Sequence, residues 1–189
     1  MVTFLYLAYR LAGRDTSELD LIPELIEQTI ALTTPQVKAL TPEVNAWEDC
    51  YSLGYGTTYS IALEGSLKLK EITYSHCEGM LSTEFKHGPL SAITEGFPVL
   101  FTVDPQDVPV IVSGINEVTC RGGRAIAIGQ EDASLRANAS DMIVLPQASS
   151  EISSLLSVLP LQLLSYYMSV ARGYDPDFPR NLSKTLTVD

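Results

Sequence analysis

The sequence predicts an α/β fold, a three-layer αβα sandwich built around a parallel sheet. Between residues 50 and 171, short apolar segments typical of strands alternate with segments of helical periodicity. The segment 98–103 (PVLFTV) has the composition of a buried strand, and strands joined by helical crossovers indicate a parallel sheet that is covered on both faces. With 189 residues, 46% of them hydrophobic, the chain can also bury a sizeable core.

Residues 1–47 are predicted to be connecting helices rather than a separate globule. Apolar residues recur at helical spacing in 1–13, and capping residues at 15–18 precede a second helix over about 18–32. We expect Thr34-Pro35 to stop that helix, because the residue before a proline is disfavoured in helical conformation. A third helical segment is expected over 35–47.

The α/β domain is predicted over residues 48–172, followed by a Pro-rich polar tail over 173–189. Within the domain we expect strands at 50–53, 98–103, 124–129 and 142–145, and helices at 58–73, 82–86, 109–120 and 152–171. The stretch between 74 and 81 is polar and contains glycine, so it is assigned no element. By composition alone the tail would be read as frayed.

The segment 152–171 carries no charge over twenty residues, which is long enough to cross a bilayer. Five serines, Gln162 and Pro160 interrupt it, so we interpret it as a buried, proline-kinked core helix. The segment 1–13 has no basic start and contains Arg10, which argues against a signal peptide. Three cysteines without a CxxC spacing predict neither a zinc site nor a disulfide framework, and indicate a reducing cytoplasm.

The formal charge of −11 argues against nucleic acid and anionic membranes as main partners. An anionic substrate would therefore need a local cluster of cations. Three of the five lysines (Lys68, Lys70 and Lys86) fall within nineteen positions, with His76 between them and His87 adjacent. This basic segment is the candidate site for an anionic small molecule.

Glu64, Lys68 and Glu71 form a charged stripe on the helix predicted over 58–73, because offsets of four and seven residues share one helix face. The stripe is framed by the large apolar residues Ile61, Leu67 and Ile72. One interpretation is a partly buried cleft in which pKa values shift. The other is an ordinary surface ion pair, worth a few tenths of a kcal/mol.

Two further motifs are weak. Gly54-x-Gly56 opens a helix after a strand and could hold an anion, but Tyr59 replaces the third glycine of a dinucleotide fingerprint, so a tight turn is the simpler interpretation. His76-Cys77-Glu78 contains metal-ligating residue types, but there is no second ligand pair, so no metal is predicted.

Several segments resemble the isomerase portion of glucosamine-6-phosphate synthase, also called glutamine–fructose-6-phosphate aminotransferase (isomerising). They are 62–72 (ALEGSLKLKEI), 84–90 (EFKHGPL), 159–163 (LPLQL), 179–184 (PRNLSK) and 187–189 (TVD). The resemblance covers essentially the whole chain. It implies the second of two sugar isomerase (SIS) lobes, each a parallel sheet between helices.

The resemblance also implies residue roles. Glu71 matches the base that moves a proton between C1 and C2 of the sugar, and Lys68 matches a lysine near the sugar. His87 matches the ring-opening histidine, which in the family reaches into the neighbouring subunit's site. Lys184 matches the lysine of a tail that closes over the substrate, and Ser183 matches a backbone contact to the sugar. Arg180 and Glu64 are further candidates for substrate binding.

This implied chemistry is ketose–aldose isomerisation, which needs a ring-opening acid or base, a proton-shuttling carboxylate and cations that stabilise an enediolate. No metal or organic cofactor is implied. The family's phosphate-binding Ser/Thr-rich loop and its glutaminase domain have no counterpart in this sequence. Three functions therefore stay open: a part of the synthase that works with a separate first lobe and glutaminase, a fructosamine-phosphate deglycase, or a non-catalytic sugar-phosphate-binding regulator. In each case a homodimer is expected.

Overall fold

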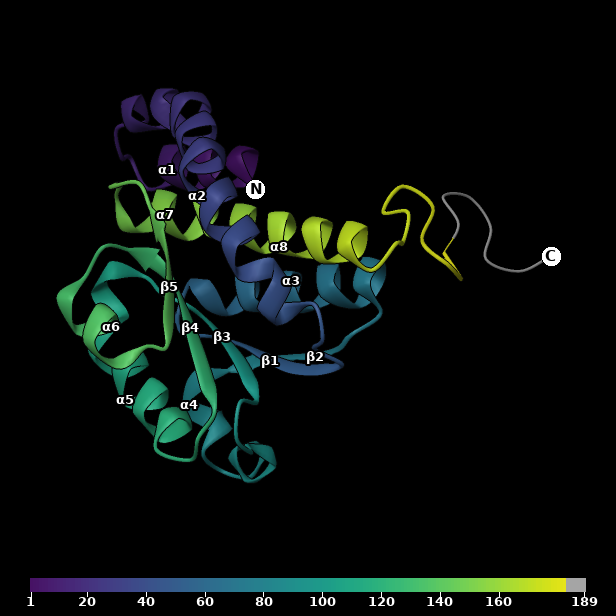
Figure 1. Ribbon diagram of the computed structural model, residues 1–189. Helices are drawn as coiled ribbons and strands as arrows, with labels where there is room; N and C mark the ends of the chain where they lie inside the picture. Colours follow the sequence, from purple (N-terminus) through teal and green to yellow (C-terminus); the bar gives the residue numbers. More distant parts are fainter. Residues whose placement is uncertain (183–189) are drawn as a thin grey trace.

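The computed structural model describes residues 1–182 and shows an all-parallel, five-stranded sheet between two layers of helices (Figure 1). The strands are β1 (Asp49–Gly54), β2 (His76–Leu81), β3 (Pro98–Thr102), β4 (Arg124–Gln130) and β5 (Asp141–Leu145). Their spatial order is β2-β1-β3-β4-β5. The strand β2 therefore pairs on one side of β1, and β3, β4 and β5 follow in order on its other side. The predicted three-layer αβα fold is confirmed.

The described chain forms eight α-helices, most of which cover one of the two faces of the sheet. They are α1 (Val2–Leu11), α2 (Ile22–Val44), α3 (Thr58–Thr73), α4 (Ser82–Phe85), α5 (Val108–Thr119), α6 (Ala133–Asn138), α7 (Ser150–Leu156) and α8 (Val158–Ala171), with short 3-10 helices at Ser17–Leu21, Pro89–Ala92 and Pro105–Asp107. One core joins α2, α3 and α8 to the sheet, and a second joins α4, α5 and α6 to its other face. In β3, Leu100 belongs to the first core while Val99 and Phe101 belong to the second, because successive side chains of a strand point to opposite faces.

The helix α2 runs without a break through Pro35 and Pro42, so the predicted stop at Thr34-Pro35 is wrong. An interior proline costs about 3 kcal/mol. Val37, Leu40 and Val44 are buried against the sheet and α8, and each such burial contributes about 1.5–3 kcal/mol. Tertiary packing therefore offsets the local preference to stop.

The strand β2 lies where no element was predicted, in the polar segment between α3 and α4. It is an edge strand and pairs with β1 alone, in the register Cys50↔Cys77. Cys77 is its one fully buried side chain. An edge strand with a single buried residue has no apolar run to reveal it in the sequence.

The apolar segment near the C-terminus forms two helices, α7 and α8, rather than one kinked helix. They meet at Ser157, because Pro160 lacks an N–H and its ring would clash with the carbonyl of Leu156 in a continuous helix. The stretch Ser150–Ala171 is long and apolar enough to cross a membrane, yet 61% of its most apolar window is buried inside the fold. Its second helix, α8, packs against α2 and α3 on one face of the sheet.

Candidate functional site

The helix α3 begins at a tight turn directly after β1. A β-carbon at Gly54 would lie 2.3 Å from the carbonyl oxygen of Thr58, and Gly56 has a φ of +53°. The hydroxyl of Thr58 accepts a hydrogen bond from the N–H of Tyr55 at 3.1 Å and donates one to the carbonyl of Thr102 at 2.9 Å. These contacts favour the tight-turn interpretation of the Gly54-x-Gly56 motif over an anion site.

The predicted charged stripe forms one ion cluster on α3. The ammonium nitrogen of Lys68 lies 2.6 Å from a carboxylate oxygen of Glu71 and 3.6 Å from one of Glu64. The side chains of Lys68 and Glu71 are about 30% exposed and that of Glu64 is 40% exposed. The hydrogen bond from Lys68 to Glu71 raises the pKa of Lys68, although partial burial opposes the rise. At neutral pH the cluster is therefore one ammonium held between two acidic side chains.

Glu71 also lines a groove of about 420 Å³ at the C-terminal end of α3. The groove is bounded by the end of that helix, the start of β2 and the first part of the tail. Its lining residues are Lys70, Glu71, Tyr74, Ser75, His76, Arg180, Asn181 and Leu182. Three of these side chains are cationic or can become so (Lys70, His76 and Arg180), which is the local concentration of positive charge that an anionic ligand requires.

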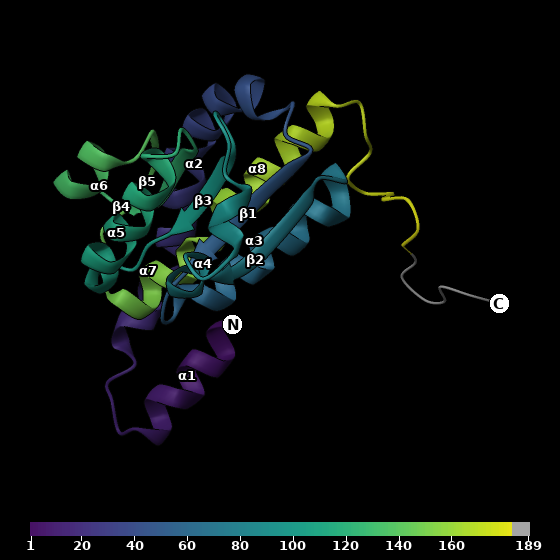
Figure 2. The same cartoon turned by 90° about the horizontal axis from the view of Figure 1, so that it is seen from below.

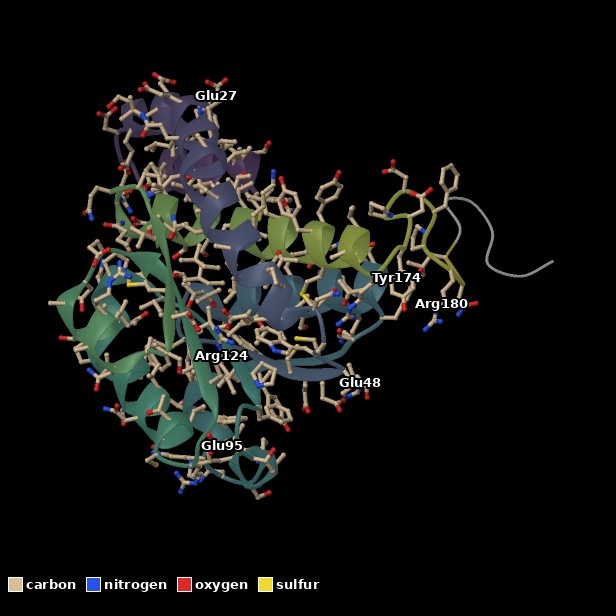
Figure 3. All side chains as sticks on the ribbon, viewed as in Figure 1. Glu27, Glu48, Glu95, Arg124, Tyr174 and Arg180 are labelled. Carbon is tan, nitrogen blue, oxygen red and sulfur yellow. The ribbon has the colours of Figure 1, made fainter. Side chains whose placement is uncertain are left out.

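The tail reaches this groove from the end of α8. Arg172 anchors its start, because its guanidinium donates hydrogen bonds to the carbonyls of Asn45, Trp47 and Thr73 and to the hydroxyl of Ser75. Figure 3 shows the labelled side chains of Tyr174 and Arg180 next to each other beyond the end of α8. The structure thus brings Arg180, a candidate for substrate binding, to the groove that Glu71 lines.

The structure does not bring His87 to this groove within one chain. His87 is exposed in the loop after α4, close to the C-terminal end of β2. Glu71 lies near the other end of this six-residue strand, because it lines one groove with His76, the first residue of the strand. Lys86 lines a different cavity of about 240 Å³, between α4 and α5. Within the described chain the predicted basic segment therefore does not line one cavity, because Lys70 and His76 lie at the groove while Lys86 lines the other cavity.

The remaining predictions concern the tail residues Ser183 and Lys184 and the metal-ligating residue types at 76–78. Ser183 and Lys184 lie outside the described residues, so their predicted roles stay predictions. In β2, Cys77 is buried while His76 and Glu78 are exposed on the opposite face, so these neighbours do not converge. Within residues 1–182, no group of three or more His, Cys, Asp or Glu side chains is placed to share a metal ion.

One groove-lining residue, Tyr74, had no signal in the sequence. It is the first residue after α3, where the backbone is left-handed. Its hydroxyl accepts a hydrogen bond from Arg180, more than a hundred positions away in the sequence. Lys70 and His76 also line the groove, and the clustering of cations in the sequence had identified both.

The fold is an α/β lobe whose parallel sheet is covered by helices on both faces. In its candidate site, the lysine–glutamate cluster and the cationic tail meet at the C-terminal end of α3. The chain belongs to the SIS domain family, whose model matches residues 45–172.

Similar proteins narrow this assignment. A glutamine–fructose-6-phosphate aminotransferase (isomerising) from Pyrobaculum aerophilum is 38% identical over 187 residues, covering 96% of this chain and 31% of the relative. The protein of that name from Methanothermobacter thermautotrophicus is 44% identical over 174 residues, covering 90% of this chain and 29% of the relative. The chain thus spans about a third of the length of the relatives that it matches.

A solved structure agrees with these relatives. The C-terminal domain of glucosamine–fructose-6-phosphate aminotransferase from Francisella tularensis superposes with a TM-score of 0.76 at 32% identity, covering 85% of this chain and 45% of that one. The resemblance that the sequence motifs predicted is therefore confirmed. This chain covers less than half of that domain. A single lobe of a two-lobed isomerase portion would cover a similar share.

Proposed function

We propose that this chain is the second SIS lobe of a sugar isomerase that converts fructose 6-phosphate and ammonia to glucosamine 6-phosphate and water. In this proposal residues 48–172 form the lobe, residues 1–47 connect it to a first SIS lobe, and the tail over 173–189 closes the site. The observation that carries the proposal is the 2.6 Å contact between Lys68 and Glu71, next to a groove that the tail helps to form. The names of the relatives support fructose 6-phosphate as the substrate, and the name of the Francisella tularensis protein includes glucosamine.

Glu71 is the proposed base, which removes a proton from one of C1 and C2 and returns it to the other. Its carboxylate is proposed to accept that proton when the sugar is bound. The ammonium of Lys68, which lies 2.6 Å from Glu71, is proposed to stabilise the negative charge of an enediolate. Lys184, Ser183, Arg180 and Glu64 are proposed to bind the substrate, and the chemistry needs no metal or organic cofactor.

His87 is proposed to open the sugar ring in the site of a neighbouring subunit. The separation of His87 from Glu71 along β2 supports this role, because one chain does not bring the two side chains together. A homodimer supplies each site with the missing histidine and is the simplest closed assembly. We place this assembly in the cytoplasm, where the free cysteines stay reduced.

A separate first lobe and a glutaminase are proposed partners, because the chain covers only about a third of its relatives. A fructosamine-phosphate deglycase and a non-catalytic regulator remain the alternatives. The deglycase would release an amine from a fructosamine phosphate, and the regulator would bind a sugar phosphate without turnover. Neither alternative accounts for the relatives' names, so the synthase half is the better supported function.

The test is hydrogen exchange at C1 of fructose 6-phosphate in deuterated water, with a first SIS lobe supplied. We expect Glu71→Gln to fold normally and to lower the exchange rate by about 10²–10⁴-fold, the usual contribution of a general base. The matched control is Glu27→Gln, an exposed glutamate on α2 far from the tail (Figure 3). Exchange at the wild-type rate in Glu71→Gln would refute the assignment of the base.

A further inference from the structure

The residue after α3, Tyr74, has a backbone conformation that tyrosine rarely adopts. Its φ of 61° and ψ of 14° are left-handed. Apart from Asn181, it is the one non-glycine residue with positive φ in the described chain. A bulky side chain is disfavoured there, whereas glycine is not. Such an outlier raises the question of what its side chain does.

The ring of Tyr74 holds two residues of the tail. The Tyr174 ring packs on it at a centroid distance of 4.8 Å, and the guanidinium carbon of Arg180 lies 3.9 Å from its centroid on a cation–π contact. The hydroxyl of Tyr74 accepts a hydrogen bond from the backbone N–H of Arg180 at 3.0 Å. One side chain thus contacts the tail through its ring and through its hydroxyl.

This hydrogen bond is the sole one that joins residues 175–182 to the rest of the described chain. The other hydrogen bonds of that segment are internal to it, around Asp175, and the side chain of Phe178 is 82% exposed. The path of the tail beyond Tyr174 therefore depends on Tyr74.

The position of Tyr74 links the tail to the proposed base. Glu71 precedes it by three residues, so the two residues lie about one helical turn apart at the end of α3. Arg180 and the two residues after it then form a wall of the groove that Glu71 lines. A tail docked on this ring is placed next to the carboxylate.

We propose that Tyr74 is a positioning residue, a platform that docks the C-terminal tail at a fixed distance from Glu71. The effect of this docking on catalysis rests on the proposed function. The docking itself does not depend on that function. Because the platform is part of α3, any movement of the end of this helix would move the tail and the carboxylate together.

Docking is tested without catalysis by limited trypsin digestion of the full chain, in which cleavage after Arg180 is followed by mass spectrometry. The variant Tyr74→Gly removes the ring and fits the left-handed backbone, so the fold is expected to persist. We expect cleavage after Arg180 to accelerate by at least about tenfold, because the contacts that hold the segment closed are lost. Tyr74→Phe keeps the ring and should stay within about threefold of the wild type.

The matched control is Tyr166→Ala, which removes a half-exposed tyrosine from α8 that is not in contact with the tail in the described structure. It should leave the cleavage rate unchanged. If Tyr74→Gly is cleaved after Arg180 at the wild-type rate while its melting temperature shows that it is folded, the platform is refuted. That failure would leave the role of Glu71 untouched.

The positioning role has its own test in the assembled isomerase. We expect Tyr74→Gly to raise KM for fructose 6-phosphate by about tenfold with a smaller loss of kcat, because this variant loses the docked tail but keeps the base. Tyr74→Phe should restore KM. A free tail together with an unchanged KM would overturn the positioning role. Loss of exchange in Glu71→Gln would be seen in either case, so the two proposals fail separately.

Discussion

The side-chain amide of Gln36 pairs with both backbone groups of Val144. The N–H of Val144 donates to the Gln36 carbonyl oxygen at 2.8 Å, and the Gln36 amide nitrogen donates to the Val144 carbonyl at 3.2 Å. Val144 lies in β5, the edge strand opposite β2. The glutamine therefore takes the place of a neighbouring strand and covers part of an edge that could otherwise pair with another chain.

We expect Gln36→Ala to lower the free energy of unfolding by about 1–2 kcal/mol, because two backbone groups lose their partners. Urea unfolding followed by circular dichroism would measure this loss. Gln28→Ala is the control, since its amide bonds only to the exposed Glu24 one turn earlier in the same helix, and should cost a few tenths of a kcal/mol. Equal losses in the two variants would show that the pairing with β5 contributes nothing specific.

The sequence predicts most of the fold because the buried elements carry their own signals. The helix over Thr58–Thr73 was predicted with its observed bounds, and β3 and β4 were predicted to within one residue of theirs. The strand β2 was missed because an edge strand buries little. The continuation of α2 through Pro35 was missed because packing against α8, far away in the sequence, decides it.

The candidate site also has features that the sequence predicts and features that it does not. The stripe of Glu64, Lys68 and Glu71 follows from helical periodicity alone, so its geometry could be predicted. The role of Tyr74 depends on a left-handed backbone and on a distant tail residue, and no local pattern encodes either. The separation of His87 from Glu71 depends on the direction of β2, which was not predicted.

Asp104 gives a prediction about pH. It is 2% exposed, and its carboxylate accepts hydrogen bonds from the hydroxyls of Ser150, Ser154 and Thr57 and from the N–H of Gln106. Burial pushes the pKa of Asp104 upward, but the hydrogen bonds, that from Ser150 foremost, outweigh it and hold the pKa below its ordinary value. A lowered pKa in the folded state means that the ionised form stabilises the protein above the pKa of the unfolded chain. This stability is lost as the pH falls through the folded-state pKa.

We therefore expect Asp104→Asn to lower the free energy of unfolding at pH 7 by about 2–3 kcal/mol, the contribution of hydrogen bonds to a charged group. The difference from the wild type should shrink as the pH falls below about 4, where the wild-type carboxylate also loses its advantage. Urea unfolding at pH 7, 5 and 3 would measure it, with the exposed Asp20→Asn as control. A difference that is constant across this range would contradict the role of the charge.

Truncation after Phe178 tests the tail as a whole. The described residues that this truncation removes, 179–182, contribute one hydrogen bond and one cation–π contact to the fold, so the melting temperature of the free chain should fall by no more than about 3 °C. In the assembled protein, the truncation should abolish the stabilisation by fructose 6-phosphate. Thermal unfolding with and without the sugar phosphate measures both effects. An undiminished shift with the sugar phosphate would show that the tail is not part of the site.

The helix α1 carries several large apolar side chains that are exposed. Phe4 is 77% exposed and Leu11 is 89% exposed, with Leu7 half exposed beside them. Figure 2 shows α1 set apart from the sheet and its two helical layers. It is held from its other side, where the hydroxyl of Tyr9 donates to Glu18 at 2.5 Å. An exposed apolar patch of this kind marks an interaction surface or an aggregation hazard.

We expect this surface to bind a second copy of the chain, most simply in a two-fold dimer. The variant Phe4→Ser/Leu7→Ser/Leu11→Ser makes the patch polar without touching Tyr9, so the fold should keep its melting temperature while the dimer dissociates. Light scattering coupled to gel filtration would measure the mass of each form. Phe178→Ser is the control, because it removes an equally exposed aromatic side chain from the tail, and it should leave the dimer intact. A wild-type chain that is a stable monomer at high concentration would refute self-association through α1, and a dimer that survives the triple substitution would place the interface elsewhere.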